Sequence, residues 1–279
     1  MSSQKIWLIT GVSSGFGRCL TEEVLKAGDF VIGTLRKPQQ VEEFNRQYAG
    51  KAMAVRMDVT KKNEIVDGLR LAMGSHKHTD VLVNNAGYGL FGAVEEASEQ
   101  ETRAQMETNF FGALALTQAV LPSMRKQRSG HIVQISSVAG VCTLPGLGIY
   151  NASKFALEGF SEALAQEVAP LGIKVTLVEP GPFRTHWAGD SAKIAERSIP
   201  DYENTAHATT KQIQGYNGNQ PGDPVKAAQA IIRAVGSATP PVHLPLGEIA
   251  IDRIREKMRN LEKEIAAWEE VSVKTAFAA

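Results

Sequence analysis

Short apolar runs alternate with amphipathic, helix-like stretches along most of this 279-residue chain. Apolar runs bounded by glycine, proline or polar residues predict buried strands, and an apolar period of three to four residues predicts helices. Strands are expected at residues 5–10, 30–35, 51–57, 80–84, 130–136, 173–178 and 241–246. Helices are expected at residues 15–27, 39–48, 61–74, 99–127, 150–169 and 224–236. This alternation predicts an α/β fold over residues 1–279: one doubly wound domain with a seven-stranded, mainly parallel sheet flanked by helices.

The end of the chain carries a separate helical pattern. Apolar side chains recur there in alternating steps of three and four, at Ile251, Ile254, Met258, Leu261, Ile265 and Trp268. This spacing places them on one face and predicts an amphipathic C-terminal helix over residues 248–270. The stripe is shorter than the three to four heptads that indicate a coiled coil. Packing against its own domain is the favoured interpretation, and a contact between subunits is the alternative.

A glycine-rich turn follows the first predicted strand. Its glycines, Gly11, Gly15 and Gly17, have the spacing G-x-x-x-G-x-G, and a helical pattern begins within it. Glycine allows a tight turn and a close approach of phosphate to the backbone, and a helix N-terminus offers N–H groups to an anion. The turn therefore predicts a dinucleotide phosphate site formed by Gly11, Ser13, Ser14, Gly15, Phe16 and Gly17. A strand–helix turn without a ligand is the alternative.

Tyr150 and Lys154 stand four residues apart, shortly after Ser137 in the chain. On a helix the two would share one face. There the ammonium would favour the phenolate and lower the phenol pKa below its usual value of about 10. Such a tyrosine could exchange a proton near neutral pH, and Ser137 would hold the reacting oxygen. The three residues predict acid–base catalysis of an alcohol/ketone interconversion.

Five separated motifs support this chemistry. They are residues 10–17, Asn84-Asn85-Ala86-Gly87, Asn109, Ser137 with Tyr150 and Lys154, and Pro180-Gly181. Together they resemble the short-chain dehydrogenase/reductase family, specifically over residues 5–185. The resemblance implies a Rossmann-type fold and an NAD(P)-dependent oxidoreductase that interconverts a ketone or aldehyde and an alcohol by hydride transfer. The general pattern is similar to the hydroxysteroid and retinol branch, which implies a bulky apolar substrate, and relatives are often homodimers or homotetramers.

The resemblance also implies roles for single residues. Asn109, Ser137, Tyr150 and Lys154 would be catalytic, with Asn109 kinking its helix to hold a water that contacts the lysine. Lys154 would also bind the nicotinamide ribose. Further cofactor contacts are implied for Val59, Asn85, Ala86, Gly87, Tyr150, Pro180, Gly181, Phe183 and Thr185.

Two strand ends bear on the choice of cofactor. The second predicted strand closes with Leu35-Arg36-Lys37, without the carboxylate that usually binds the ribose in NAD-preferring sites. The planar, permanently charged guanidinium of Arg36 suits a 2′-phosphate, so NADP(H) is expected to be preferred, with NAD(H) possible. A solvated Arg36 is the alternative, and Ser14 stands where many NADP-using relatives carry a base. Asp58 resembles the family's adenine contact, or else it caps the following helix.

A long segment, residues 186–222, follows the Pro180 motif. Stretches of this length inside a compact domain are usually functional loops or disordered, so a substrate-closing loop with short helical turns is expected. The predicted substrate contacts are Ser137, Leu144, Tyr150 and Trp187. Further candidates for an apolar wall are Phe183, Gly89, Leu90, Phe91 and Leu147.

Composition narrows the classes of partner. Thirty basic and thirty acidic residues give no net charge, which argues against nucleic acid or an anionic membrane. The chain has no run of 18 apolar residues and no signal-peptide core. Cys19 and Cys142 suggest no disulfide framework, and no His/Cys cluster has zinc-site spacing. A cytoplasmic enzyme that acts on a small molecule without a metal is expected.

Other functions remain open at this point. A cofactor-binding regulatory or scaffold protein without turnover would need Gly15 and Arg36, but it would have no use for a tuned phenol. A sugar-nucleotide epimerase or dehydratase also uses Tyr150 and Lys154, yet such relatives run longer and differ in glycine spacing. An NAD-preferring alcohol dehydrogenase is the third alternative.

Overall fold

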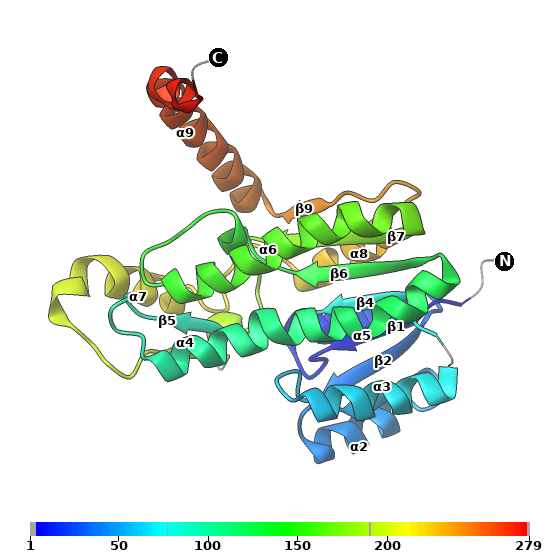
Figure 1. The fold of residues 1–279 in the computed structure, drawn as a ribbon. Coiled ribbons are helices and arrows are strands. Elements are labelled where there is room, and N and C mark those ends of the chain that lie inside the picture. Colours follow the sequence, from blue (N-terminus) through cyan, green and yellow to red (C-terminus); the bar gives the residue numbers. More distant parts are fainter. Residues whose placement is uncertain (1–3, 77, 190, 278–279) are drawn as a thin grey trace.

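The centre of the molecule is a seven-stranded sheet (Figure 1) in a computed structural model that describes residues 4–76, 78–189 and 191–277. Its strands are β1 (Ile6–Thr10), β2 (Phe30–Leu35), β3 (Ala52–Arg56), β4 (Val81–Asn84), β6 (Gly130–Ile135), β7 (Ile173–Pro180) and β9 (His243–Leu246). They lie in the order β3-β2-β1-β4-β6-β7-β9, and every neighbouring pair is parallel. The predicted α/β fold with seven strands is confirmed.

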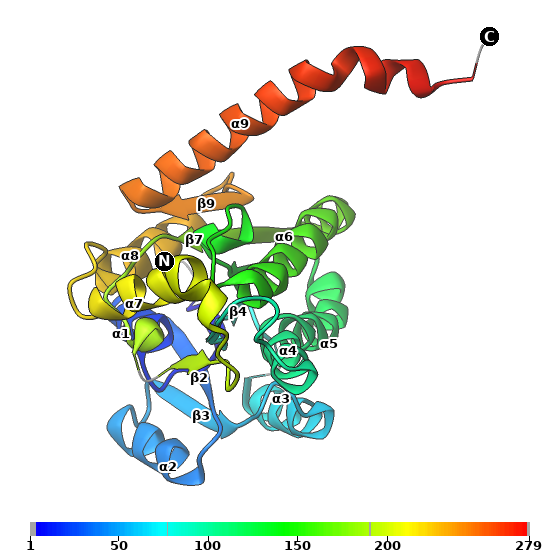
Figure 2. The ribbon, with the colours of Figure 1, turned by 90° about the vertical axis from the view of Figure 1, so that its left-hand side faces the viewer.

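Helices cover both faces of this sheet (Figure 2). One layer contains α1 (Gly15–Lys26), α2 (Pro38–Gln47) and α8 (Pro224–Val235), and the other contains α3 (Lys62–His76), α5 (Gly112–Gln127) and α6 (Gly148–Val168). Because both faces are covered, the central strands need apolar residues at successive positions rather than alternate ones. Every residue of β1 is buried accordingly. Two of the hydrophobic clusters lie between the sheet and these layers.

The strand order reverses between β1 and β4, since β1 pairs with β2 on one side and with β4 on the other. Open α/β sheets bind ligands at such a switch point, beside the carboxyl ends of the strands. The glycine turn follows β1 and Asn85 follows β4, while Ser137 and Gly181 follow β6 and β7. The predicted site residues therefore gather along one edge of the sheet.

The helix expected at residues 99–127 is interrupted. It consists of α4 (Glu99–Met106), a π-helical turn (Glu107–Phe111) and α5. Ser98 and Glu101 form a reciprocal capping box at the start of α4, which fixes where the helix begins. The π-helical turn contains Asn109, and the helix is thus irregular where a kink was expected.

The segment 186–222 is more ordered than a loop with a few turns. Its described residues form short helical turns at His186–Ala188, Pro200–Tyr202 and Glu203–His207, and the longer α7 (Ala208–Gly215). It also contributes β8 (Ala192–Ile194), which pairs in parallel with β5 (Gly89–Phe91) in a small second sheet. The expected helical turns are present, but this strand pair was not predicted.

The C-terminal helix α9 (Glu248–Ser272) extends away from the body of the molecule (Figures 1 and 2). Ala250 is its one buried residue within the described chain, and Ile251 and Ile254 are half-buried. The predicted helix is confirmed, but the favoured packing against its own domain is wrong beyond these first turns. In the part of the chain that the structure describes, no helix has the length and apolar character to cross a membrane.

Candidate active site

The turn after β1 has the backbone that its glycines allow. Gly11 and Gly15 have φ angles of +70° and +55°, a region that side chains rarely adopt. At Gly17 a Cβ would collide with the carbonyl oxygen of Gly11. Ser14 precedes α1 without a side-chain cap, and the first turn of α1 holds no acidic residue. An open glycine turn at an uncapped helix N-terminus fits a pyrophosphate.

Asn85 fixes this turn to the end of β4. Its amide nitrogen Nδ2 donates to the carbonyl oxygens of Thr10, at 2.8 Å, and Gly11, at 3.0 Å. In return, the Thr10 hydroxyl accepts the backbone N–H groups of Asn85 (2.8 Å) and Ala86 (2.9 Å). These hydrogen bonds tie together two predicted cofactor segments, the glycine turn after β1 and the residues after β4, which lie on opposite sides of the switch point.

Arg36 and Asp58 lie near each other at the ends of β2 and β3. Arg36 is exposed. Burial alone would raise the pKa of Asp58, but hydrogen bonds from Thr60 and the charge of Arg36 outweigh burial and lower it. The Asp58 carboxylate accepts the backbone N–H (3.0 Å) and the hydroxyl (2.8 Å) of Thr60. Asp58 therefore caps the turn that precedes α3, which begins at Lys62. The alternative that Asp58 is the N-cap of α3 itself is wrong. Val59 is mostly buried.

Ser137, Tyr150 and Lys154 meet where β6 ends against α6. The Ser137 side chain neighbours the phenol of Tyr150 and has a lowering effect on its pKa. Lys154 Nζ donates to the carbonyl oxygen of Ile135 at 2.8 Å and lies 5.9 Å from the centre of the tyrosine ring. Tyr150 and Lys154 are buried, with exposed fractions of 5% and 6%. The tertiary structure brings together the three residues that the sequence singled out.

The pKa of Tyr150 departs from the expectation. Burial raises it to about 12, against the opposing effect of Ser137, whereas a value below 10 was expected from the neighbouring ammonium. Burial likewise lowers the pKa of Lys154 to about 8, against the opposing charge of Glu158. Both groups are removed from water, which disfavours their charged forms, and this desolvation is the largest influence on both pKa values. At pH 7 the pair is a neutral phenol beside an ammonium.

Asn109 lies in the π-helical turn and is buried. Its Nδ2 donates to the carbonyl oxygen of Tyr88 (3.0 Å) and to the hydroxyl of Ser153 (3.1 Å), while its Oδ1 accepts the backbone N–H of Tyr88 (3.1 Å). A Cβ added at Gly87 would lie 3.1 Å from Asn109 Oδ1 and 3.7 Å from Lys154 Nζ. Gly87 therefore borders both polar groups, and a side chain at this position would crowd them.

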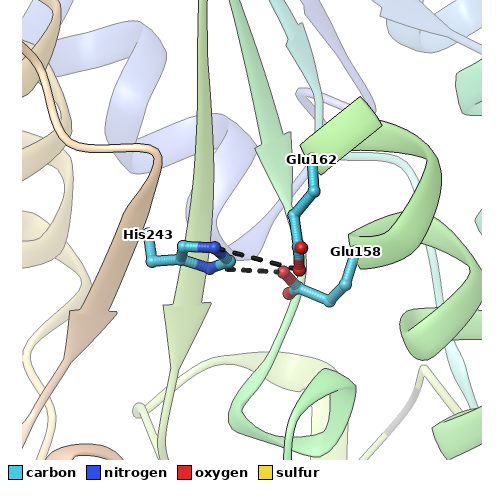
Figure 3. A group of neighbouring side chains, drawn as sticks. All are labelled: Glu158, Glu162 and His243. Atoms are coloured by element: carbon cyan, nitrogen blue, oxygen red, sulfur yellow. Dashed lines mark ion pairs between the residues drawn. The ribbon is translucent and has the colours of Figure 1, made fainter. Parts of the chain in front are cut away.

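Sequence reasoning missed Glu158, one turn beyond Lys154 on α6. Figure 3 shows Glu158 and Glu162 facing His243 of β9. His243 lies 3.8 Å from Glu158, 3.9 Å from Glu162 and 2.7 Å from the buried Glu179. Neither Glu158 carboxylate oxygen has a hydrogen-bond partner in the described chain, and burial raises the pKa of this residue to about 7. The four-residue steps from Tyr150 to Lys154 to Glu158 were the available signal.

The Pro180 motif lies beside the glycine turn. Gly181 N–H donates to the carbonyl oxygen of Leu246 at 3.0 Å. A Cβ at Gly15 would lie 3.6 Å from Thr185, and the ring centres of Phe16 and Phe183 are 5.3 Å apart. Thr185 and Phe183 therefore belong with the predicted phosphate-binding turn, and Phe183 does not lie among the apolar residues around Trp187.

An apolar group covers the phenol of Tyr150. The Trp187 ring lies 5.2 Å from the rings of both Tyr150 and Phe91, measured between centres. A Cβ at Gly89 would lie 2.7 Å from Trp187, so glycine makes room for the indole. Leu144 is partly buried against this group, and Leu147 is fully within it. Leu90 is buried in β5, with its N–H donated to Gln105.

A second residue that sequence reasoning missed holds the segment 186–222 in place. The buried Glu96 accepts hydrogen bonds from the backbone N–H groups of Ala93 (2.7 Å) and Ile199 (2.6 Å), and it pairs with His207 at 2.7 Å. The pKa of His207 is raised, and the hydrogen bond with Glu96 is the largest cause. Nothing in the spacing of Glu96 distinguishes it from a surface acid, so only the fold reveals this contact.

Comparison with known proteins agrees with this architecture. The chain is 41% identical to a 3-ketodihydrosphingosine reductase of Bacteroides thetaiotaomicron, over 88% of each chain. It is 36% identical to human retinol dehydrogenase 8, over 84% of this chain and 79% of the relative. The crystal structure of a short-chain dehydrogenase from Streptomyces avermitilis superposes with a TM-score of 0.92 at 42% identity, over 99% of this chain and 100% of that one.

A further structural neighbour bears on the cofactor. A serine dehydrogenase complexed with NADP⁺ matches with a TM-score of 0.75 at 25% identity, over 86% of this chain and 94% of that one. The model of the family described as short chain dehydrogenase matches residues 5–194. This chain therefore belongs to the short-chain dehydrogenase/reductase family of NAD(P)-dependent oxidoreductases.

Proposed function

We propose that this protein is an NADP(H)-dependent carbonyl reductase that interconverts a ketone or aldehyde and the corresponding alcohol, with Tyr150 as the proton donor and acceptor. The observation that carries the proposal is the group of half-buried Ser137 with buried Tyr150 and Lys154 under an aromatic cover. A protein that only binds the cofactor would have no use for a desolvated phenol beside an ammonium, since both cost stability.

Each residue has a separate task in this scheme. The nicotinamide supplies or accepts the hydride, and the protein orients the substrate and moves the proton. Ser137 donates a hydrogen bond to the reacting oxygen and holds it beside Tyr150. In reduction, the neutral phenol gives its proton to the oxygen as negative charge develops there. The Lys154 ammonium stabilises the phenolate that remains, and Asn109 positions the adjoining backbone of Tyr88.

The raised phenol pKa keeps Tyr150 in its acid form at neutral pH. A tyrosine with a pKa of about 12 is protonated at neutral pH and is ready to act as an acid. Oxidation of an alcohol needs the phenolate, which burial disfavours.

The substrate is proposed to be apolar and bulky. Trp187, Phe91 and Leu144 surround the phenol with hydrocarbon, and segment 186–222 is proposed to close over the substrate. The relatives named for 3-ketodihydrosphingosine and retinol act, by those names, on a lipid ketone and a lipid alcohol. Initial rates of NADPH oxidation with long-chain ketones, steroids, quinones and short aliphatic ketones test this. Turnover confined to short ketones would contradict it.

The preference for NADP(H) is proposed from Arg36. Its exposed guanidinium lies at the end of β2, where the neighbouring Asp58 carboxylate is occupied by Thr60. A 2′-phosphate would gain a charge-assisted contact with Arg36. Arg36→Ala is expected to lower the ratio of kcat/KM for NADPH over NADH about tenfold, the equivalent of roughly 1.4 kcal/mol.

The matched control for this measurement is Arg46→Ala. It removes an arginine of α2, the helix that follows β2 and Arg36. It should leave the ratio unchanged. An Arg36→Ala enzyme with the original preference would show that the arginine is merely solvated and would favour an NAD-preferring alcohol dehydrogenase.

A further inference from the structure

Helix α9 exposes apolar side chains of a size that helices normally bury. Met258, Leu261, Ile265 and Trp268 are 51%, 41%, 54% and 65% exposed. Their spacing of three and four residues places them in one stripe, which continues toward the half-buried Ile251 and Ile254 at the base of the helix. Contiguous exposed patches of this kind mark interaction sites.

The charges beside the stripe divide into two halves. Arg255 and Lys257 flank its first half on either side, while Glu262 and Glu264 flank its second half in the same two positions. Residues that flank an apolar seam set the partner and the orientation of paired helices. A basic half followed by an acidic half is complementary to a copy of itself running in the opposite direction.

We propose that α9 pairs antiparallel with α9 of a second copy of this chain, around a two-fold axis between Arg259 and Asn260. With that centre, all six residues of the stripe form layers: Met258 meets Leu261, Ile254 meets Ile265, and Ile251 meets Trp268 of the second copy. Two-fold symmetry repeats each layer, as an isologous interface requires. The exposed Trp268 would then cover the half-buried base of the opposite helix.

The same register matches the charges. Arg255 faces Glu262 of the second copy, Lys257 faces Glu264, and symmetry doubles both pairs. Like charges meet at the outer ends, where Glu248 faces Glu269. A parallel pair would keep Lys257 opposite Glu262, but it would set Glu264 against Glu269 beside the seam. The antiparallel arrangement is therefore the one that the flanking charges favour.

The test is the mass of the full chain in solution, measured by light scattering during size-exclusion chromatography. The wild type is expected to be a dimer or a higher even oligomer, and Ile265→Glu to have half its mass. Ala267→Glu adds the same charge away from the stripe and should leave the mass unchanged. Retained NADPH turnover in both variants would show that they are folded.

Cysteine cross-linking then tests the orientation. Under oxidation, Ile254→Cys mixed with Ile265→Cys should give a disulfide between copies, located by peptide mapping, while Ile265→Cys alone should give none. A cross-link of Ile265→Cys with itself would overturn the antiparallel register. A monomeric wild type, whether or not it binds anionic phospholipid vesicles, would overturn the proposal as a whole, and so would an Ile265→Glu variant with unchanged mass.

Discussion

Helices α6 and α9 distribute polar and apolar residues in opposite ways. Buried polar groups are concentrated in α6, among them Tyr150, Ser153, Lys154 and Glu158. In α9, by contrast, large apolar side chains face solvent. Burying ionisable groups costs stability and shifts their pKa values, while exposing apolar surface forgoes the gain from removing it from water. Each helix departs from simple packing in the way that a function would require, chemistry for α6 and association for α9.

The largest expected effect separates these two functions. Tyr150→Phe keeps the ring and its packing but removes the proposed acid, so kcat should fall about 10³-fold, within the range for losing a positioned acid–base group. NADPH affinity and oligomeric mass should stay the same. Steady-state kinetics, cofactor titration and light scattering on one preparation check all three.

Tyr48→Phe is the matched control, because this tyrosine stands at the end of α2, away from the Ser137–Tyr150–Lys154 group. It should retain full turnover. A Tyr150→Phe enzyme within a few-fold of wild type would refute the proposed proton transfer and with it the assigned role of α6.

The next effect compares one substitution on the two helices. Leu157 of α6 is 1% exposed and Leu261 of α9 is 41% exposed. Leu157→Ala should lower the free energy of unfolding by about 3 kcal/mol, because a buried leucine leaves a cavity. Leu261→Ala should change it by less than about 0.5 kcal/mol at protein concentrations where the wild type is monomeric. Urea unfolding at low concentration measures both.

If Leu261→Ala were as costly as Leu157→Ala in the monomer, α9 would have to pack against its own body. That result would restore the interpretation favoured by the sequence pattern. A cost for Leu261→Ala that appears only at high protein concentration would instead agree with pairing of α9.

The smallest expected effect concerns Glu158, the buried carboxyl group one turn beyond Lys154 on α6. The pKa of Glu158 is raised to about 7 in the folded protein, so folding retains a proton that the unfolded chain releases above about pH 4.5. Stability is therefore lost as pH rises from about 5 to 7. Glu158→Gln lacks this titration, and its stability relative to wild type should improve by about 2 kcal/mol over that range.

Thermal or urea unfolding of both proteins between pH 5 and 8 gives this difference. Glu162→Gln, which alters an exposed neighbour in the same group, is the control and should show little pH dependence relative to wild type. A Glu158→Gln variant whose advantage grew toward acid would show that Glu158 is held as a carboxylate, contrary to its burial.

Much of this site could be predicted because its spacing is local. The glycine turn, Asn85 and the Tyr150–Lys154 pair each lie within a few residues of a strand end or a helix start, and parallel strands bring such ends to one edge. The irregular helix at Asn109 was expected from the resemblance to the short-chain dehydrogenase/reductase family. The β5–β8 pair and the contact between Glu96 and His207 join segments about one hundred residues apart, and no local pattern encodes such contacts.

The sequence by itself determined the order of strands and helices, the edge of the sheet where the chemistry lies, and the family, because period and motif spacing are properties of the chain. Only the tertiary structure decided the protonation of Tyr150 and the exposure of α9. Desolvation depends on everything packed around a group, not on its neighbours in sequence, so burial reversed the expected shift of the phenol pKa. The apolar stripe of α9 could be predicted from the sequence. Whether it packs against the body of the same chain depends on the tertiary structure, which leaves most of it exposed.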